Sequence, residues 1–431
     1  MRRTLTAIGA SVAALALLAG CSAGGAGEQP ADGEVTLEMW SWDPGMADIV
    51  DVWNSENPDI QVKLSDPAGG DELVSRILTA HKSGDAADIV KVEYQSLPAL
   101  IANGVAADIT EYVPDAAKDF TPGAFAQVEF EDKTYGLPQD FAPLVFFYRQ
   151  DIFEQYGLKV PTTWDEYAAT ARALHAADPS KYLGTFSSTD PGWFTGLTQQ
   201  AGANWWSASG ETWTVDIDDD ASVKVADYWQ GLIGEGVVKG DPFWSPQWNK
   251  EMDDGTYAGW ISGAWAPAQF GGIAPNSAGK WVMTSLPAWT AGDTTTGIWG
   301  GSATAVTTDS KHPAEAAKFI DWFNTSDEAL ALQVEKINIF PAALNGQQLD
   351  ALKTPPAYMP NQPSYYADVA AIAESARSFD IWGPNATVTF GAYNDGFAKA
   401  ITDGTAFSEV LKTMQTVTVD DMEKLGFSVE K

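Results

Sequence analysis

Residues 35–64 read VTLEMWSWDPGMADIVDVWNSENPDIQVKL and contain one complete strand–helix–strand unit. Apolar and polar positions alternate over residues 35–42, which is typical of a strand with one buried face. Apolar side chains then recur at helical spacing between residues 46 and 57, and a second short strand follows at 60–64. A strand, a helix and a strand in this order predict a crossover connection and two parallel strands.

The same alternation continues along the rest of the chain, so we expect an α/β protein. A helix at 71–83 ends before Gly84, a strand follows at 88–92, and another helix covers 96–103. The sequence predicts further strands at 144–148, 257–261, 281–286 and 298–307, and further helices at 151–156, 163–177, 221–233 and 313–323, with a mostly helical segment at 364–426.

The first residues have the pattern of a secretory signal. Arg2 and Arg3 precede a short apolar run at 8–18, which is too short to span a bilayer. The run ends in Leu-Ala-Gly-Cys at 18–21, which resembles the bacterial lipobox, and Cys21 is the only cysteine in the chain. We therefore predict a signal peptide at 1–20, lipid attachment at Cys21 and a flexible tether at 21–33. An ordinary signal peptide with a chance cysteine is the alternative.

The charge of the chain argues against several partners. Loss of Arg2 and Arg3 with the signal leaves 23 basic and 58 acidic residues, a net charge of −35. Such a surface repels nucleic acid and anionic lipid, so we expect no nucleic-acid partner and membrane attachment through the lipid anchor only. The acidic residues are spread along the chain, as on an ordinary solvated surface.

The chain holds 18 tryptophans, an excess that indicates a binding surface for sugar rings. An indole can lie against the apolar face of a sugar while carboxylates, amides and backbone groups bind its hydroxyls. Trp53, Trp229 and Trp322 lie on apolar helix faces, so we expect them in the core. Of the neighbours Trp205 and Trp206, one is expected to be exposed.

Ligands bind outside the carboxyl ends of strands in parallel sheets, and tryptophans and acids near strand ends and glycine-rich turns are the candidates for such a site. For any single tryptophan, packing in the core remains the alternative. The predicted ligand-binding residues are Trp40, Trp42, Asp43, Glu93, Tyr94, Asp140, Trp193, Trp205, Trp260, Trp265, Trp299, Gly300, Gly301 and Trp382.

The sequence lacks the common signatures of an enzyme. His81, His175 and His312 do not form a HExxH motif, and neither a GxSxG elbow nor a phosphate loop with its lysine is present. No cluster with metal-ligand spacing appears, so we expect no metal and no cofactor. A glycoside-active enzyme with two carboxylates leaves no local signature and remains the second hypothesis.

Several strings, in this order and spacing, resemble the bacterial family 1 extracellular solute-binding proteins, the maltose-binding-like group. The resemblance covers essentially the whole chain after the tether. One departure is Arg149, which stands where the family usually has Asn. The matching strings are Trp40–Trp42, Ser83–Asp85 leading into Ala87–Val90, Tyr135–Pro138 followed by Phe146–Phe153, Pro161–Glu166, Trp299–Ser302 and Lys311–Phe319.

The resemblance implies a two-lobed periplasmic-binding-protein-like fold, each lobe a mostly parallel sheet flanked by helices, with the ligand cleft between the lobes. The first lobe is expected at 34–139 plus 303–345 and the second at 140–302 plus 346–431. An aromatic residue in the stretch around Trp382 often stacks on sugar in this family.

The resemblance also implies a function: a monomeric, non-catalytic receptor on the extracytoplasmic face of the cell membrane, which captures a carbohydrate and passes it to the permease subunits of an ABC transporter. Several aromatic candidates in both lobes favour an oligosaccharide. A polyol, polyamine, peptide or metal chelate is the alternative cargo. Several converging carboxylates in the cleft would favour a cation, whereas one or two with amides would favour a sugar.

Overall fold

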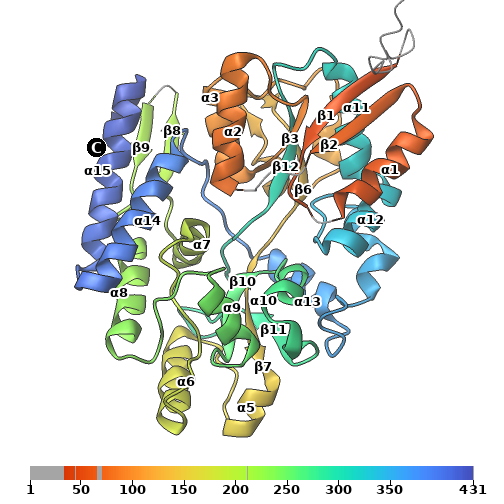
Figure 1. The fold of residues 1–431 in the computed structure, drawn as a ribbon. Helices are drawn as coiled ribbons and strands as arrows, with labels where there is room; N and C mark the ends of the chain where they lie inside the picture. The colour runs from red at the N-terminus through yellow and green to blue at the C-terminus, as the bar shows by residue number, and fades with distance from the viewer. Residues whose placement is uncertain (1–33, 44, 66–69, 211, 431) are drawn as a thin grey trace, which may run out of the picture.

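A computed structural model describes residues 34–430 except 44, 66–69 and 211, and the predicted signal, Cys21 and the predicted tether lie outside them. Figure 1 shows two lobes: one at the upper right, with β1 to β3 and α1 to α3, and one that runs from the bottom to the left, with α5 to α8, α14 and α15. This arrangement agrees with the expected two-lobed α/β fold. Within the described residues no helix is both long enough and apolar enough to span a bilayer.

The first lobe is built on a five-stranded sheet in the order β2-β1-β3-β12-β6. Strand β1 pairs in parallel with β2 and with β3, as the opening strand–helix–strand unit predicts, whereas β12 runs antiparallel to both β3 and β6. The strands are β1 (Val35–Trp40), β2 (Ile60–Ser65), β3 (Ile89–Glu93), β6 (Leu137–Asp140) and β12 (Ser302–Val306).

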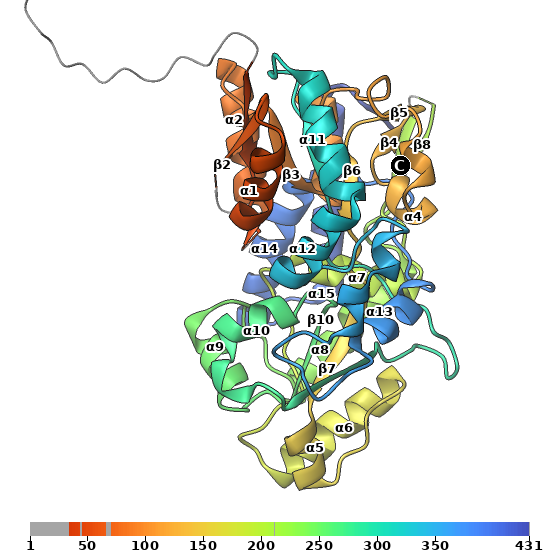
Figure 2. The same ribbon diagram turned by 90° about the vertical axis from the view of Figure 1, so that its right-hand side faces the viewer.

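Helices α1, α11 and α12 lie next to one another over one face of this sheet, as Figure 2 shows. Trp53 on α1 packs edge-on against Phe319 of α11, which joins two segments far apart in the sequence. The helices of this lobe are α1 (Met46–Glu56), α2 (Gly70–Ser83), η1 (Tyr94–Ser96), α3 (Leu97–Ala102), η2 (Ala116–Lys118), α4 (Pro122–Phe125), α11 (Pro313–Thr325) and α12 (Asp327–Ile337), and a small hairpin joins β4 (Glu129–Phe130) to β5 (Lys133–Thr134).

The second lobe differs from the expectation in its central sheet. Strand β7 (Leu144–Arg149) lies between β10 (Gly259–Gly263) and β11 (Trp281–Ser285), and both pairs are antiparallel. The prediction of a mostly parallel sheet is therefore wrong for these three strands. Strand β7 leaves the crossing between the lobes, while its two neighbours run toward it, and no local residue pattern encodes that direction. Beside these strands, parallel pairing occurs as single bridges, such as that of Tyr182 with Tyr257.

Long helices form a layer at the left of Figure 1, where α15 packs against α14 and α8. Strand β13 adds in parallel to the hairpin of β8 and β9 beside them. The remaining elements are α5 (Gln150–Tyr156), α6 (Trp164–Ala177), α7 (Pro191–Ala201), β8 (Trp206–Ser209), β9 (Thr212–Val215), α8 (Asp220–Gly234), α9 (Pro246–Asp253), α10 (Pro267–Ile273), η3 (Pro275–Ser277), η4 (Gly346–Gln348), η5 (Asp350–Lys353), α13 (Tyr365–Ala373), α14 (Ala386–Asp403), α15 (Phe407–Leu425) and β13 (Ser428–Glu430).

Three chain segments cross side by side between the lobes. The amide of Phe141 donates to the carbonyl of Phe340, and the amide of Trp299 donates to the carbonyl of Ala142, both at 3.1 Å. On either side of the crossing lies a separate hydrophobic core. The crossing is therefore the place where a ligand between the lobes meets residues from distant parts of the sequence.

Candidate functional site

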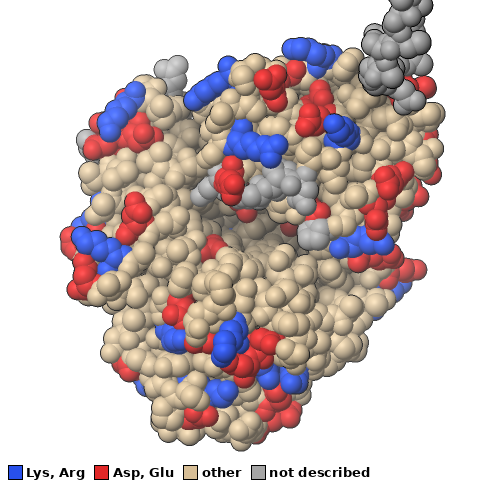
Figure 3. All heavy atoms as spheres, viewed as in Figure 1, with Lys and Arg blue, Asp and Glu red and all other residues tan. Residues whose placement is uncertain are grey.

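A narrow cavity lies between the lobes next to the crossing; its enclosed space is about 20 Å³, and it opens to solvent. The visible part of the hollow in Figure 3 is mostly free of charged side chains. Both lobes and one crossing segment contribute to the walls. The lining residues are Tyr94, Gln95, Gln127, Gly192, Thr195, Ile298, Gly300, Ser378 and Trp382.

Tyr94 forms the first lobe's aromatic wall, directly after β3. Its hydroxyl donates to the backbone carbonyl of Asp140 at 2.9 Å, which fixes the ring at the crossing. Burial raises the pKa of Tyr94 well above its ordinary value, and the neighbouring charge of Asp140 adds to the effect. The phenol therefore stays protonated and remains a donor. The end of the third strand was predicted to reach the site, and the structure places Tyr94 there.

Gly300 and Gly301 turn the chain sharply before β12. Both adopt left-handed backbone angles, with φ of 98° and 96°, which side chains rarely adopt. A Cβ on Gly301 would lie 2.7 Å from a ring carbon of Tyr94, and a Cβ on Gly300 would lie 2.7 Å from the indole nitrogen of Trp265. The predicted close approach of backbone thus occurs, and Gly300 lines the cavity.

Trp382 forms the second lobe's aromatic wall and is the other predicted aromatic residue that reaches the cavity. It packs at 4.9 Å between ring centroids against Phe379 and at 5.9 Å against Trp206. Gly383 allows this packing, since a Cβ there would lie 2.3 Å from the indole nitrogen of Trp206. The ring is therefore held from behind.

Asp43 and Asp140, predicted as ligand-binding acids, belong instead to a buried ionic cluster below the cavity. The ammonium group of Lys91 pairs with Asp43, which also accepts a hydrogen bond from Gln139 at 3.1 Å. Asp140 accepts from the backbone amide and the hydroxyl of Ser302, at 2.9 and 2.5 Å. Burial raises the pKa of Asp140, and the charge of Lys91 opposes that rise. Both carboxylates have partners within the protein and neither lines the cavity, so their contact with ligand stays a prediction.

Trp193 and Trp205, which were also predicted as ligand residues, do not line the cavity either. Both are fully buried in the second core, where the indole of Trp193 donates to the carbonyl of Ile261 at 3.1 Å and that of Trp205 donates to the hydroxyl of Ser222 at 2.8 Å. Trp206 is also fully buried, although one member of this pair was expected to be exposed. The pair enters β8 rather than a regular helix, and both rings contact Phe379.

Trp260, Trp265 and Trp299 gather in one aromatic cluster beside the cavity. The indole of Trp265 donates to the carbonyl of Trp299 at 2.8 Å, and the two rings lie 4.8 Å apart. Trp260 is buried and does not line the cavity, so its contact with ligand stays a prediction. Trp299 stands behind the cavity wall, close to Gly192, and Trp265 is half-buried.

The other predicted residues of the first lobe lie outside the cavity lining. Trp40 is buried under the guanidinium group of Arg76, 4.3 Å from its ring centre, and lines a separate open hollow beside α2. Trp42 is half-buried and lies 4.6 Å from the ammonium group of Lys91. The carboxylate of Glu93 accepts a hydrogen bond at 2.9 Å from Gln95, which lines the cavity.

Two glutamines and a serine of the cavity were not predicted. Gln95 follows Tyr94, so the rule for strand ends could have found it. Gln127 lies in a turn after α4, and its amide donates to the hydroxyl of Ser378 across the cavity at 3.1 Å. No local pattern in the sequence marks Gln127 or Ser378, because each acts only through the approach of the other lobe.

Arg149, the departure from the family pattern, lies away from the cavity. It is buried at the end of β7, where its guanidinium group forms two hydrogen bonds to Asp151 at 2.8 and 2.7 Å. Among the residues that the structure describes, no group of three His, Cys, Asp or Glu side chains could hold a metal ion. Cys21, the predicted lipidation site, is not among them.

Comparison with known proteins agrees with this geometry. The family model of the bacterial extracellular solute-binding proteins matches residues 40–329. The chain belongs to this family. The predicted resemblance is thereby confirmed, and the two lobes with a cavity at their crossing are those of a solute-binding protein.

Relatives of this solute-binding protein are sugar-binding proteins. The galacto-N-biose-/lacto-N-biose I-binding protein of an ABC transporter from Bifidobacterium longum, solved with lacto-N-biose, is 31% identical with a TM-score of 0.84, covering 92% of this chain and 99% of that one. A binding protein from B. animalis subsp. lactis, solved with β-1,6-galactobiose, is 27% identical with a TM-score of 0.83, covering 92% and 100%. The arabinooligosaccharide-binding protein of Bacillus subtilis is 24% identical over 72% of this chain and 74% of its own length.

Proposed function

We propose that this solute-binding protein captures a carbohydrate, with an oligosaccharide favoured, in the cavity between its lobes. The observation that carries the proposal is the chemistry of the walls. Tyr94 and Trp382 offer aromatic surfaces, while Gln95, Gln127 and Thr195 offer amide and hydroxyl groups. A sugar ring presents an apolar face and a polar edge, and these walls are complementary to both.

The same walls disfavour a polyamine or another cation. No Asp or Glu is among the described residues that line the cavity. Two buried acids, Asp43 and Asp140, are held by Lys91, Gln139 and Ser302. A cation would therefore lose its water without gaining a counter-charge, which is strongly unfavourable.

The relatives support a sugar of at least two units. The proteins from Bifidobacterium longum and B. animalis subsp. lactis were solved with disaccharides and match more than nine-tenths of this chain. The relative from Bacillus subtilis carries the name of an oligosaccharide.

The protein serves as the monomeric receptor of an ABC transporter in this proposal. Closure of the lobes over the sugar favours the form that docks on the permease subunits, and the receptor itself leaves the sugar intact. Lipid on Cys21 attaches it to the extracytoplasmic face of the cell membrane. The lobes divide at residues 139/140, 302/303 and 345/346 in this account.

A thermal-shift screen tests the proposal. We expect at least one oligosaccharide, at a concentration of about one hundred times its Kd, to raise the Tm by roughly 3 °C, since binding to the folded state alone adds about 2.7 kcal/mol. The panel includes lacto-N-biose, β-1,6-galactobiose and arabino-oligosaccharides, with spermidine as the cationic control. A shift with spermidine alone would contradict the proposal, and so would cleavage of a bound sugar on prolonged incubation.

A further inference from the structure

Gln199 of α7 is a buried polar residue that contacts the cavity wall from behind. It keeps only 1% of its surface in solvent. Its carboxamide oxygen accepts a hydrogen bond from the backbone amide of Ile298 at 3.0 Å, and Ile298 lines the cavity. Gln199 is not among the described residues of the lining, so it lies one residue behind the wall.

The backbone pairing at the crossing explains why Ile298 needs this acceptor. Two hydrogen bonds join residues 142–144 to residues 297–299, one on each side of Ile298, which itself lies opposite Pro143. Alternate residues of an antiparallel pair direct their amide and carbonyl groups away from the partner strand, and α7 lies on that side of Ile298. A buried amide in this position costs free energy unless an acceptor is present, and Gln199 supplies one.

Two glycines allow α7 to approach the crossing segment closely enough for this bond. A Cβ on Gly297 would lie 1.8 Å from the carbonyl oxygen of Gly196, and a Cβ on Gly196 would lie 2.7 Å from the carbonyl oxygen of Ile298. Only glycine fits at either position. Gly192, one turn earlier on the same face of α7, lines the cavity together with Thr195. The contact at Gly196 therefore sets the distance between two walls of the cavity, the first turn of α7 and Ile298.

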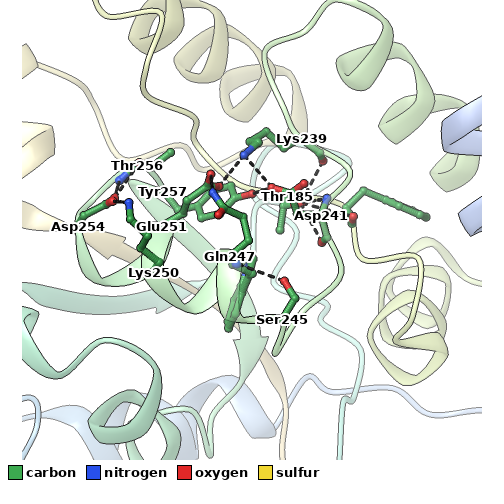
Figure 4. Close-up of polar contacts among 12 residues, drawn as sticks. Thr185, Lys239, Asp241, Ser245, Gln247, Lys250, Glu251, Asp254, Thr256 and Tyr257 are labelled. Carbon is green, nitrogen blue, oxygen red and sulfur yellow. Dashed lines mark hydrogen bonds and ion pairs between the residues drawn. The ribbon is translucent and has the colours of Figure 1, made fainter.

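A polar cluster elsewhere in the second lobe shows the contrast with Gln199. In Figure 4, Lys239 pairs with Asp241 at 2.8 Å and with Glu251 at 2.6 Å, and the hydroxyl of Tyr257 donates to Asp241 at 2.6 Å. These groups pair with one another, and none of the residues labelled in Figure 4 lines the cavity. The amide nitrogen of Gln199, however, has no hydrogen-bond partner among the residues that the structure describes. A buried donor without a partner is destabilising, so stability alone does not explain a glutamine at this position.

We propose that Gln199 is a positioning residue for ligand binding: it holds Ile298 against α7, so that these two walls of the cavity move as one unit when the lobes open and close on a saccharide. The inference rests on the proposed function and deepens it, because it names a residue that controls affinity without touching the ligand. Groups that bind a ligand must be held within about 0.5 Å of their productive positions. Without the carboxamide, the amide of Ile298 loses its acceptor, and the wall shifts as the amide finds another.

Calorimetric titration of Gln199→Met and Gln200→Met with lacto-N-biose, β-1,6-galactobiose and arabino-oligosaccharides tests the positioning role. Both substitutions keep the length of the side chain and remove a buried carboxamide. Gln200 is the matched control, because its hydrogen bonds go to Trp164, Pro287 and Thr295, which are not among the lining residues. We expect Q199M to lose roughly five- to tenfold in affinity and Q200M to lose less than about twofold. Q200M loses three hydrogen bonds, so it is expected to have the lower Tm of the two.

The outcomes separate positioning from stability and from the proposed function. Unchanged affinity in Q199M, or equal losses in Q199M and Q200M, overturns the positioning role and leaves the proposed function standing. Gln199→Glu keeps an acceptor oxygen for Ile298 and is expected to bind within about threefold of the wild type, so a loss as large as that of Q199M also overturns it. In the ligand-free protein, hydrogen exchange of the Ile298 amide is expected to be faster in Q199M and unchanged in Q200M, and the opposite pattern contradicts the inference. If the wild-type protein binds no saccharide, the proposed function falls, and the positioning role falls with it.

Discussion

The two lobes differ in what packs beside the crossing. In the first lobe Lys91 pairs with Asp43 and lies close to Asp140. In the second lobe Trp260 is surrounded by other aromatic rings. Ion pairs and hydrogen bonds are directional, so each atom of the ionic cluster has one position. Ring packing is not directional to the same degree, and its free energy depends on buried area. The first lobe therefore fixes the geometry of the crossing, and the second lobe supplies surface on which a sugar can stack.

Removal of the buried cation is expected to have the largest effect. In Lys91→Met, Asp43 and Asp140 remain buried without a positive charge, which is expected to lower the free energy of unfolding by about 3–5 kcal/mol. Urea unfolding measures the change. Lys353→Met removes an exposed partner of Asp350 and serves as control, with no measurable change expected. A loss below about 1 kcal/mol in K91M would show that the first lobe does not depend on its ionic cluster.

Gly301→Ala tests whether the turn at the crossing is as constrained as the cluster beneath it. The added Cβ would meet the ring of Tyr94 at 2.7 Å from a backbone with φ of 96°, so we expect a loss of about 2–4 kcal/mol in urea unfolding. Gly404→Ala is the matched control, since φ there is 78° but nothing lies near the added atom. Equal losses in the two variants would mean that the contact with Tyr94 contributes nothing.

The hydrogen bond between Gln127 and Ser378 connects the first lobe with the second, and its removal is expected to weaken saccharide binding. Gln127→Ala is predicted to weaken saccharide binding about fivefold, because a hydrogen bond across the cavity contributes about 1 kcal/mol to the closed form. Ser378→Ala should give a similar loss, and the double variant should lose little more in calorimetry. Additive losses would show that the two side chains act separately.

The smallest expected effect is on the pH dependence of stability. The stabilisation contributed by Asp140 and that contributed by Asp178 are expected to change in opposite directions with pH. Burial raises the pKa of Asp140, so the folded state binds a proton there more readily than the unfolded state. The difference in free energy of unfolding between the wild type and Asp140→Asn should therefore shift against the wild type as pH rises through the range above 4. Hydrogen bonds from Ser180 and Tyr156 lower the pKa of Asp178 to about 2. The stabilisation of the wild type relative to Asp178→Asn should therefore be complete above about pH 4 and disappear as pH falls toward 2.

Tm measurements of the wild type and both variants between pH 2 and 6 check this contrast. The same sign of pH dependence in D140N and D178N would contradict it. Each difference is taken against the wild type at the same pH, so the many other carboxylates of the chain cancel.

The contrast between the lobes also explains what the sequence could predict. Residues 35–64 contain one strand–helix–strand unit whose elements contact one another, so the parallel half of the first sheet follows from local periodicity. The direction of β7 depends on where the chain leaves the crossing, and periodicity contains no information about that. The antiparallel sheet of the second lobe therefore could not be predicted from the residues.

The candidate site residues also differ in how far local features of the sequence predict their position. Tyr94, Gly300 and Trp382 lie at a strand end, a glycine turn and an irregular stretch; those local features made them candidates, and all three line the cavity. Trp193 and Trp205 satisfy similar criteria but are buried, because burial of an indole depends on partners far away in the chain. An excess of tryptophan thus predicts ring surface, and only the packing decides which rings a ligand can reach.

The central claim is that a saccharide binds between the lobes, and a crystal structure with the saccharide that gives the largest thermal shift tests it most directly. The account predicts a sugar ring between Tyr94 and Trp382, with hydroxyl groups within hydrogen-bond distance of Gln95 or Gln127. A saccharide bound elsewhere on the protein, with the cavity between the lobes left free of sugar, would contradict the account.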